Sequence, residues 1–445
     1  MTKNSKAKKR KTWQRKRRAQ KRGATTLVVE TEGGILVREI PPTSALLCRD
    51  THGTAAEDSI SGAADTWGLP DFVYGPEEVN KGDSRRELGD LFVIVENLAA
   101  VVQVKGRPEP TELPDRECKW VSKQVKKAVS QASGTLRTVE RTGATLRSRR
   151  GQQLAISKAD YEWIKVVVIE HDAPPPEFSE IDFDLAPDTV VLLRSDWDFL
   201  FSELRSTTGV LLYLQRAHGI RLGQHPTHYY HLAQKDEATP PEPPGFAPSV
   251  EGWRTEATPQ MSLAPAGVDH GRRELLLRAI MEDAAVAGLD ADVMEEARLT
   301  TLSCLDRFPL VHRPALCEWI PAKMAFVLEA SASQPSNVHV VSRSFVTEDP
   351  FIPNFVVVVC AAKVDEWLMT KFNERVVARH IIFEKMLDAD PAGLRTVGLM
   401  ITPAVSPSRL WDTTTLVAQG DVKLSPAEEA ALLEAYPMQP HDFES

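Results

Sequence analysis

Residues 90–105 read DLFVIVENLAAVVQVK, and this stretch indicates the fold of the first half of the chain. Two runs rich in β-forming residues, Leu88–Glu96 and Ala99–Lys105, are separated only by Asn97-Leu98. Such short spacing between two β-rich runs predicts a hairpin. Nearly all residues of both runs are apolar, so we expect the two strands to lie deep within a sheet.

Three polar side chains interrupt these apolar strands: Asp90, Gln103 and Lys105. Because alternate residues of a strand face the same side, a short hairpin can bring Asp90 beside Gln103 and Lys105. A buried carboxylate or ammonium group is unfavourable unless it is paired or bound to a metal ion. The conflict between these residues and their apolar surroundings therefore indicates a functional site. The structural alternative is an ordinary hairpin in which Lys105 blunts the edge of a sheet.

The segments that follow the hairpin have a clear order. A polar loop with three prolines leads to Glu117–Arg141, which contains no proline and carries apolar residues at helical spacing. Lys123, Lys127 and Gln131 lie at positions i, i+4 and i+8 and therefore share one face of this predicted helix. Tyr161–Glu170 (YEWIKVVVIE) is typical of a buried strand. The predicted order is strand, turn, strand, loop, helix, strand.

The spacing of Asp90, twelve residues and Gln103-Val104-Lys105 resembles the signature of the PD-(D/E)XK superfamily of restriction-endonuclease-like nucleases. In that family an acid at the start of one strand is followed by (D/E/Q)-x-K on the next. The run from Trp120 to Gln131 looks like the helix that carries accessory polar residues in Mrr- and RecB-like members. The resemblance covers roughly residues 70–170 and implies an α/β fold with a mixed sheet flanked by helices.

This resemblance implies metal-assisted hydrolysis of phosphodiesters with Mg²⁺ or Mn²⁺ as the cofactor. Asp90 and Gln103 would be the metal ligands, since Mg²⁺ prefers oxygen donors. Lys105 would steady the attacking water or the charge that develops on the phosphate. A role in defence against foreign DNA follows from the resemblance alone.

An upstream acid usually completes such a site. Glu87 is preferred here over Glu77 and Glu78, although three residues before Asp90 it faces the other side of a straight strand. The chain also departs from the commonest pattern by having Gln103 in place of an acid, and a neutral amide binds Mg²⁺ more weakly than a carboxylate. A nuclease-like protein that binds nucleic acid without cutting it is therefore the alternative.

The first 22 residues contain twelve Lys or Arg and no acid, whereas the whole chain has a formal net charge of −9. Such a run of like charges has no apolar face to bury, so residues 1–23 are expected to form a disordered basic tail. The tail can neutralise nucleic-acid phosphates, with Lys8, Lys9, Arg10, Arg17 and Arg18 as the expected contacts. DNA is favoured over RNA as the partner. A solubilising or ribosome-binding tail fits these residues nearly as well.

The predicted nuclease-like domain spans residues 24–235 and includes a helical extension. Residues 24–40 are expected to form two short strands, and residues 41–70 to be irregular. Val190–Leu193 is a predicted strand. Asp196–Leu204, with Ser195 or Asp196 as its cap, and Gly209–Arg216 are predicted helices.

A proline-rich linker is expected at residues 236–271. Residues 272–445 are then expected to form a second, α+β domain without an assigned role. Its predicted helices are Arg272–Ala287, Ala291–Asp306 and Asp365–Leu387, and its predicted strands are Val338–Val346, Phe355–Ala361 and Thr396–Pro403.

Two further polar clusters favour ordinary structural roles. His225, His228 and His231 could bind zinc or copper, but their spacing spreads them around a helix, so packing or surface positions are favoured. Arg375 and Arg379 lie at i and i+4 and could meet a phosphate, but a solvated charged face is favoured.

The composition and the absence of common motifs argue against several classes of protein. No apolar run approaches the ~18–20 residues that a membrane helix needs, so no membrane partner is expected. The five cysteines form no C-x-x-C pair, which argues against a disulfide framework or a cysteine zinc site and favours the cytoplasm. The chain has no P-loop, GxGxxG or G-x-S-x-G motif. The remaining hypothesis is an assembly protein whose C-terminal domain carries the function, and the oligomeric state stays open.

Overall fold

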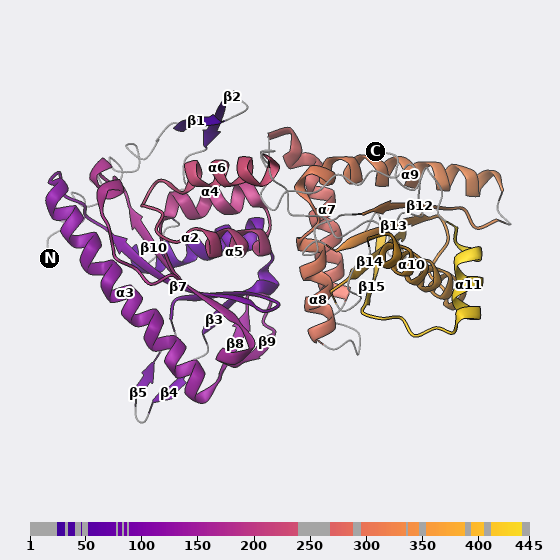
Figure 1. Cartoon of the computed structure of the whole chain (residues 1–445), viewed down its shortest axis with the longest axis horizontal. Helices are drawn as coiled ribbons and strands as arrows, with labels where there is room; N and C mark the ends of the chain where they lie inside the picture. Colours follow the sequence, from indigo (N-terminus) through magenta and orange to yellow (C-terminus); the bar gives the residue numbers. More distant parts are fainter. Residues whose placement is uncertain are drawn as a thin grey trace, which may run out of the picture. The chain divides into compact units, whose positions relative to one another are not determined.

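The computed structural model describes residues 25–31, 34–40, 46, 52–76, 79–81, 84–86, 89–238, 268–287, 295–334, 337–346, 353–387, 393–404 and 411–437. The chain divides into two compact units, Met1–Gln234 and Lys235–Ser445. Over the described residues it is a mixed α/β protein with ten α-helices, a seven-stranded sheet and a second sheet of four strands (Figure 1). None of the described helices is long and apolar enough to cross a membrane.

The seven-stranded sheet of the first unit combines parallel and antiparallel neighbours. Its strands lie in the order β11 (Thr189–Leu193), β10 (Glu162–His171), β7 (Leu98–Arg107), β6 (Leu91–Val95), β3 (Val73–Pro76), β8 (Ala144–Ser148) and β9 (Gln153–Ile156). β7, β10 and β11 run parallel, whereas β6 runs antiparallel to both β7 and β3. The carboxyl ends of β7, β10 and β11 therefore meet the start of β6 at one end of the sheet.

Helices cover both faces of this sheet. α3 (Pro114–Thr142) lies on one face, and α2 (His52–Trp67), α4 (Arg194–Leu204) and α5 (Thr207–Arg216) lie on the other (Figure 1). α3 packs there because its apolar residues recur at helical spacing, so that Ala132, Leu136 and Val139 reach the hairpin residues Phe92 and Val101. The earlier turns of α3 pack on β10 and β11. α6 (His225–Ala238) follows α5.

Two small hairpins accompany the main sheet. One consists of β1 (Thr25–Thr31) and β2 (Gly34–Ile40), and the other of β4 (Val79–Lys81) and β5 (Ser84–Arg86). The first agrees with the two strands predicted around Gly33-Gly34.

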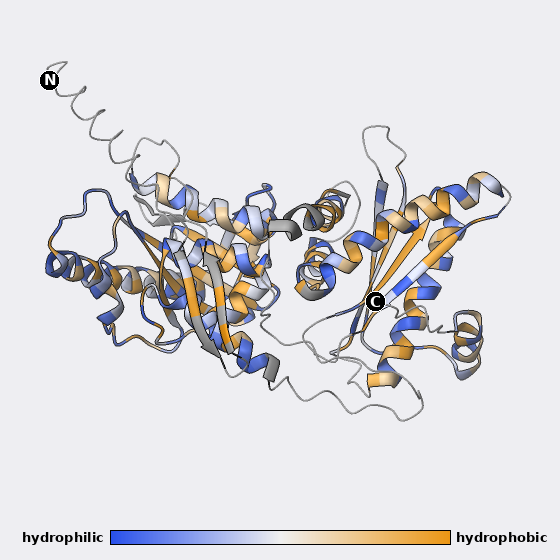
Figure 2. Ribbon diagram, turned by 90° about the horizontal axis from the view of Figure 1, so that it is seen from above, coloured by the Kyte–Doolittle hydropathy of each residue, from blue (hydrophilic) through white to orange (hydrophobic). Residues whose placement is uncertain are grey.

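The second unit is built on a four-stranded sheet in the order β12 (Val340–Phe345), β13 (Asn354–Cys360), β14 (Arg395–Pro403) and β15 (Trp411–Gln419). β13 and β14 are parallel and are joined through α10 (Glu366–Leu387), whereas both outer pairs are antiparallel. The central strands are largely hydrophobic (Figure 2), and α10 buries Phe372, Val376 and Phe383 against them. The remaining helices are α7 (Val268–Ala287), α8 (Glu295–Asp306), α9 (Arg313–Ser333) and α11 (Pro426–Ala435).

The hairpin and the long helix that follows it are confirmed, although the turn lies at Glu96-Asn97, where Glu96 has a φ of 51°. The prediction of irregular structure over 41–70 is wrong for the described part, since α2 occupies 52–67. Ala55, Ala56, Ile60 and Ala64 form its buried face, but three of them are alanines and they lie among Gly, Ser and Thr, which obscures the helical pattern.

Other boundaries also need correction. The ends of the predicted linker are helical, because α6 continues to Ala238 and α7 begins at Val268. α4 begins at Arg194 with Leu193 as its N-cap residue, so Ser195 and Asp196 lie within the first turn. Asp196 still contributes to the cap, because its carboxylate accepts from the backbone N–H of Leu193. The predictions also omitted the helices α6, α9 and α11 and the strands β3, β8, β9 and β15. The basic tail, Glu77, Glu78 and Glu87 lie outside the described residues.

Candidate functional site

The hairpin brings Asp90 and Lys105 together at one end of the sheet. Leu91 pairs with Val102, which carries Asp90 to the level of the next residues of β7. The carboxylate of Asp90 accepts a hydrogen bond of 2.6 Å from the backbone N–H of Val104 and lies 3.6 Å from Nζ of Lys105. Lys105 Nζ also donates to the carbonyl oxygen of Val104 at 2.9 Å. Both side chains keep partial contact with solvent, at 22% and 15% exposure, so the pair is accessible to a ligand.

Gln103 lies beside this pair with an unsatisfied amide. Its side chain is 2% exposed, and its Nε2 has no hydrogen-bond partner among the described residues. Gly89 approaches it closely: a Cβ on Gly89 would lie 3.1 Å from Gln103 Nε2, and the φ of +104° at Gly89 also favours glycine. A buried amide group without a partner is uncommon and indicates a place for a ligand or a water molecule.

α3 carries a second unsatisfied amide along the same stripe. Gln131 Oε1 is shielded from solvent and has no partner in the described part of the chain. One turn later, Thr135 Oγ1 would lie 3.7 Å from a Cβ on Gly89, which places this stripe of α3 over the Asp90 end of the hairpin. Lys123 and Lys127, two turns and one turn before Gln131, are exposed.

The donors at Asp90 and Gln103 fit a magnesium ion chemically. Mg²⁺ is commonly held by one or two protein oxygen ligands together with phosphate oxygens of the substrate. Asp90 and Gln103 supply a carboxylate and an amide oxygen. The third ligand that the sequence predicts, at Glu87, Glu77 or Glu78, lies outside the described residues.

A buried ionic network fixes the loop between β7 and α3. Glu117, 1% exposed, accepts two hydrogen bonds from Arg107 at 2.8 and 3.0 Å and two from Thr111 at 2.9 and 2.7 Å. The bonds from Arg107, followed by those from Thr111, hold the pKa of Glu117 far below its usual range despite burial. Nε2 of His171 lies 3.0 Å from the same carboxylate, and burial lowers the pKa of His171. We therefore assign a neutral His171 that donates to Glu117, and a bracing role for the whole network.

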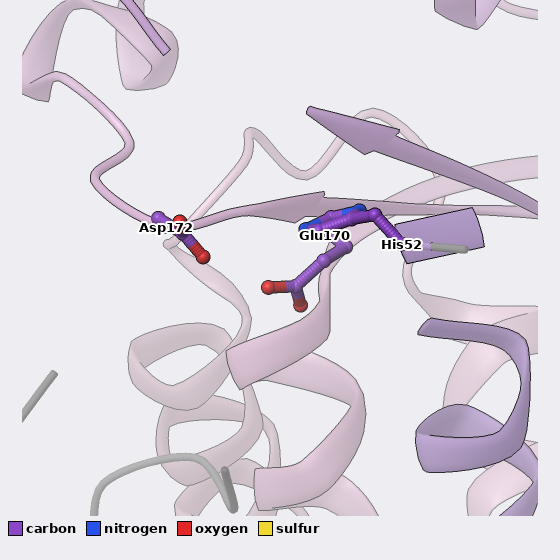
Figure 3. A group of neighbouring side chains, drawn as sticks. All are labelled: His52, Glu170 and Asp172. Carbon is purple, nitrogen blue, oxygen red and sulfur yellow. The ribbon is translucent and has the colours of Figure 1, made fainter. Parts of the chain in front are cut away.

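The opposite face of the same sheet end holds a group that the sequence analysis missed. His52 at the start of α2 meets Glu170 and Asp172 from the end of β10 (Figure 3). One ligand atom from each residue lies within 4.8 Å of the other two. Within the described ranges, this is the one set of three His, Cys, Asp or Glu side chains with that spacing. These residues could hold a metal ion.

Glu170 also contacts the start of α4. Its carboxylate accepts a hydrogen bond from Nε of Arg194, and both side chains are 4% exposed. Nη1 of the same guanidinium reaches the hydroxyl of Ser59 at 2.9 Å and the carboxylate of Asp198 at 3.4 Å. The guanidinium therefore fixes one oxygen of Glu170 in place and ties α2, α4 and β10 together.

The other predicted clusters have structural surroundings. His225 is buried: its Nε2 lies 3.1 Å from the carbonyl oxygen of Val191, and its Nδ1 lies 3.0 Å from the hydroxyl of Tyr213. Burial lowers the pKa of His225 to about 3, so it is neutral. His228 also contacts Tyr213, whereas His231 is exposed. This agrees with the favoured packing role.

The predicted solvated face at Arg375 and Arg379 is wrong for Arg379, which is 1% exposed and donates to the carbonyl oxygens of Tyr436 and Pro437. Arg375 donates to Ser342 and lies over the ring of Tyr436. The helical spacing of the two arginines does not distinguish a solvated face from one that a later segment covers.

The local sequence was sufficient to bring Asp90, Gln103 and Lys105 together, because Asp90 directly precedes one strand and the other two lie on the adjacent strand. It carried little signal for the second group. Glu170 and Asp172 follow a strongly predicted strand, but His52 lies in a segment without an apparent pattern, and only the tertiary fold brings it to them.

The chain matches no protein-family model, no curated protein sequence and no solved structure at a significant level. The geometry of the site is therefore what carries a functional proposal.

Proposed function

We propose that the first unit is a metal-dependent nuclease that hydrolyses phosphodiester bonds in nucleic acid, with DNA as the favoured substrate. The observation that carries the proposal is the pairing of Asp90 with Lys105 at 3.6 Å, at the strand end where Gln103 lies beside them. An acid and a lysine at this spacing are the residue types that the resemblance to PD-(D/E)XK nucleases requires.

The arrangement of elements supports the same proposal. β6, the turn, β7, the loop, α3 and β10 occur in the predicted order, with the additional strands β8 and β9 between α3 and β10, and β10 pairs parallel with β7. In open sheets with parallel strands, ligands bind beyond the carboxyl ends of the strands. Asp90 and Lys105 lie at that end.

The side chains have distinct roles in this proposal. Asp90 and Gln103 would hold Mg²⁺ or Mn²⁺, which supplies Lewis acidity and lowers the pKa of a bound water. The Val104 N–H orients the Asp90 carboxylate through its short hydrogen bond. Lys105 places a positive charge beside that carboxylate, where it stabilises negative charge that develops on a phosphate.

The surface next to the site favours a polyanionic substrate. Lys123 and Lys127 are exposed on the stripe of α3 that continues through Gln131 to the site, and no carboxylate in the described part of the chain pairs with them. Lysines in this setting can neutralise backbone phosphates and position them without reading sequence. The basic tail would add to this attraction.

The test compares cleavage of plasmid DNA and of RNA by the full-length chain in Mg²⁺ or Mn²⁺ with cleavage by Asp90→Asn and Lys105→Met. We expect each substitution to lower the rate at least ~100-fold. Lys165→Met is the matched control, since Lys165 lies on the neighbouring strand and pairs with Asp188 at 2.9 Å. The control should keep nearly the full rate.

Two results would overturn the catalytic proposal: no cleavage by any form of the protein, or equal cleavage by the wild type and both site variants. Circular dichroism and the melting temperature of each variant show whether it is folded. An equal loss in Lys165→Met and Lys105→Met would instead indicate a structural effect on the sheet.

The second candidate function is nucleic-acid binding without cleavage. It is favoured by one observation: the Asp90 carboxylate already has Val104 and Lys105 as partners, and Gln103 contributes no negative charge. In that case the wild type binds DNA with an affinity that falls with salt but does not cut it, and Gln103→Glu is the variant in which metal-dependent cleavage would be sought.

A further inference from the structure

We propose that His52, Glu170 and Asp172 form a binding site for one divalent transition-metal ion of the Mn²⁺ or Zn²⁺ type, separate from the Asp90 site. One imidazole nitrogen and two carboxylate oxygens suit such an ion better than Mg²⁺, which prefers oxygen ligands alone. The three ligand atoms lie within 4.8 Å of one another, so small side-chain rotations bring them onto a common ion.

The state of His52 points to a ligand. Both ring nitrogens are shielded from solvent, and neither has a hydrogen-bond partner among the described residues. A structural histidine in a folded protein ordinarily uses its ring nitrogens in hydrogen bonds. Leaving both unpaired is unfavourable, and coordination of a metal ion by one of them removes part of that penalty.

β7 leaves room for this ring. A Cβ on Gly106 would lie 2.7 Å from Nδ1 of His52, so a residue with a side chain at this position would displace the ring as it stands. Gly106 pairs with Glu170 across the parallel strands, which brings the histidine and the carboxylate to the same level of the sheet.

The charges around the group favour a dication. Two of the three ligand side chains, Glu170 and Asp172, are carboxylates, which suit a divalent ion. Arg194 occupies one oxygen of Glu170 and leaves the other for the ion. Carboxylates that bind metals are commonly oriented by such an outer hydrogen bond.

The site is distinct from the proposed catalytic site because the two use opposite faces of β7. Gln103, Lys105 and Arg107 lie on one face of the strand, and Arg107 reaches Glu117 on α3 from that face. Gly106 instead faces His52 on α2. An ion there would join the start of α2 to the end of β10 and would stabilise the first unit against unfolding.

The test is a titration of the full-length chain with Mn²⁺, followed by pulsed electron paramagnetic resonance. Nitrogen hyperfine coupling from an imidazole identifies a bound Mn²⁺ that has a histidine ligand, a signal that the Asp90 and Gln103 oxygens cannot produce. We expect this coupling in the wild type and in Asp90→Asn, and its loss in His52→Ala. His231→Ala, which removes an exposed histidine, should keep it.

A second readout protects the test against misfolding of one variant. Asp172→Asn changes a partly exposed side chain and should weaken Mn²⁺ binding at this site at least ~10-fold, while circular dichroism shows that the variant remains folded. Absence of imidazole coupling in the wild type, or its persistence in His52→Ala, would overturn the proposal. Nuclease activity plays no part in these readouts, so the two proposals can fail independently.

Discussion

His52 in the first unit and His380 in the second are both enclosed by protein, yet they differ in their hydrogen bonds. His380 is fully buried, with Nδ1 3.0 Å from the hydroxyl of Thr396 and Nε2 2.9 Å from the carbonyl oxygen of Gly420. His52 has shielded ring nitrogens and no partner for either among the described residues. The first pattern is typical of a histidine that stabilises the fold, and the second agrees with the proposed role of His52 as a metal ligand.

The same contrast separates Arg379 from Gln103. Arg379 is buried on α10 and donates to two carbonyl oxygens just after α11, so its guanidinium group caps the carboxyl end of α11. Gln103 is equally buried, but its Nε2 has no partner in the described structure. A buried polar residue therefore indicates a functional site only when one of its polar atoms lacks a hydrogen-bond partner in the described structure.

The largest effect is expected from two glycines that lie against different neighbours. A Cβ on Gly398 of β14 would lie 2.3 Å from Val376 Cγ2 and 2.8 Å from Phe372 Cζ, both in the packed core. Gly398→Ala should lower the free energy of unfolding of the second unit by about 3 kcal/mol. Gly106→Ala meets only the His52 ring and should cost less than about 1 kcal/mol, while abolishing the imidazole coupling of Mn²⁺. Urea denaturation of both variants measures the difference, and equal destabilisation would contradict it.

The next effect compares the two histidines directly. His380→Ala leaves Thr396 and the Gly420 carbonyl without their partner and should destabilise the second unit by about 2 kcal/mol. His52→Ala removes no hydrogen bond of the described structure and should change stability without metal by less than about 0.5 kcal/mol. Thermal unfolding in the presence of a chelator measures both. A large loss in His52→Ala under these conditions would show that the ring packs as a structural residue.

A third prediction concerns a buried carboxylate whose hydrogen bonds come from the backbone. Asp196 accepts from the N–H groups of Leu193 and Gly223, but complete burial raises its pKa to about 7. The folded state therefore binds a proton more tightly than the unfolded state, and stability falls as pH rises from about 4 to about 7. Asp196→Asn removes this dependence, so the stability of the variant relative to wild type should rise by about 1 kcal/mol from pH 6 to pH 8. Parallel curves over this range would contradict the assignment.

The smallest effect concerns the exposed lysines of α3. The double variant Lys123→Gln with Lys127→Gln should make the slope of log affinity for DNA against log salt shallower by about 2. Each phosphate contact contributes about 0.9 to the magnitude of this slope. Arg137→Gln with Arg141→Gln is the matched control, since both arginines are exposed on the same helix but lie ten or more residues beyond Lys127, towards its carboxyl end. Fluorescence anisotropy at several salt concentrations distinguishes the pairs. Equal slopes for both double variants would exclude a specific role for the stripe.

Local periodicity accounts for what the sequence could predict. Strand residues alternate with a period of two, so the hairpin and the shared position of Asp90, Gln103 and Lys105 followed from adjacent segments. α3 and α10 followed from apolar residues at helical spacing. α2 was missed because its buried face consists mainly of alanine, and the solvated face expected at Arg379 was wrong because α11, which covers it, was not predicted.

The two strands of the hairpin, the helix after it and the cluster of Asp90, Gln103 and Lys105 follow from the amino-acid sequence, since all of these depend on contacts between neighbouring segments. Only the folded chain shows that β10 lies parallel to β7 and that His52 reaches Glu170 over Gly106. Those contacts join segments far apart in the chain, and they depend on how α2, α3 and α4 cover the two faces of the sheet. The state of each hydrogen bond, which separates His52 from His380, likewise depends on neighbours that no local pattern specifies.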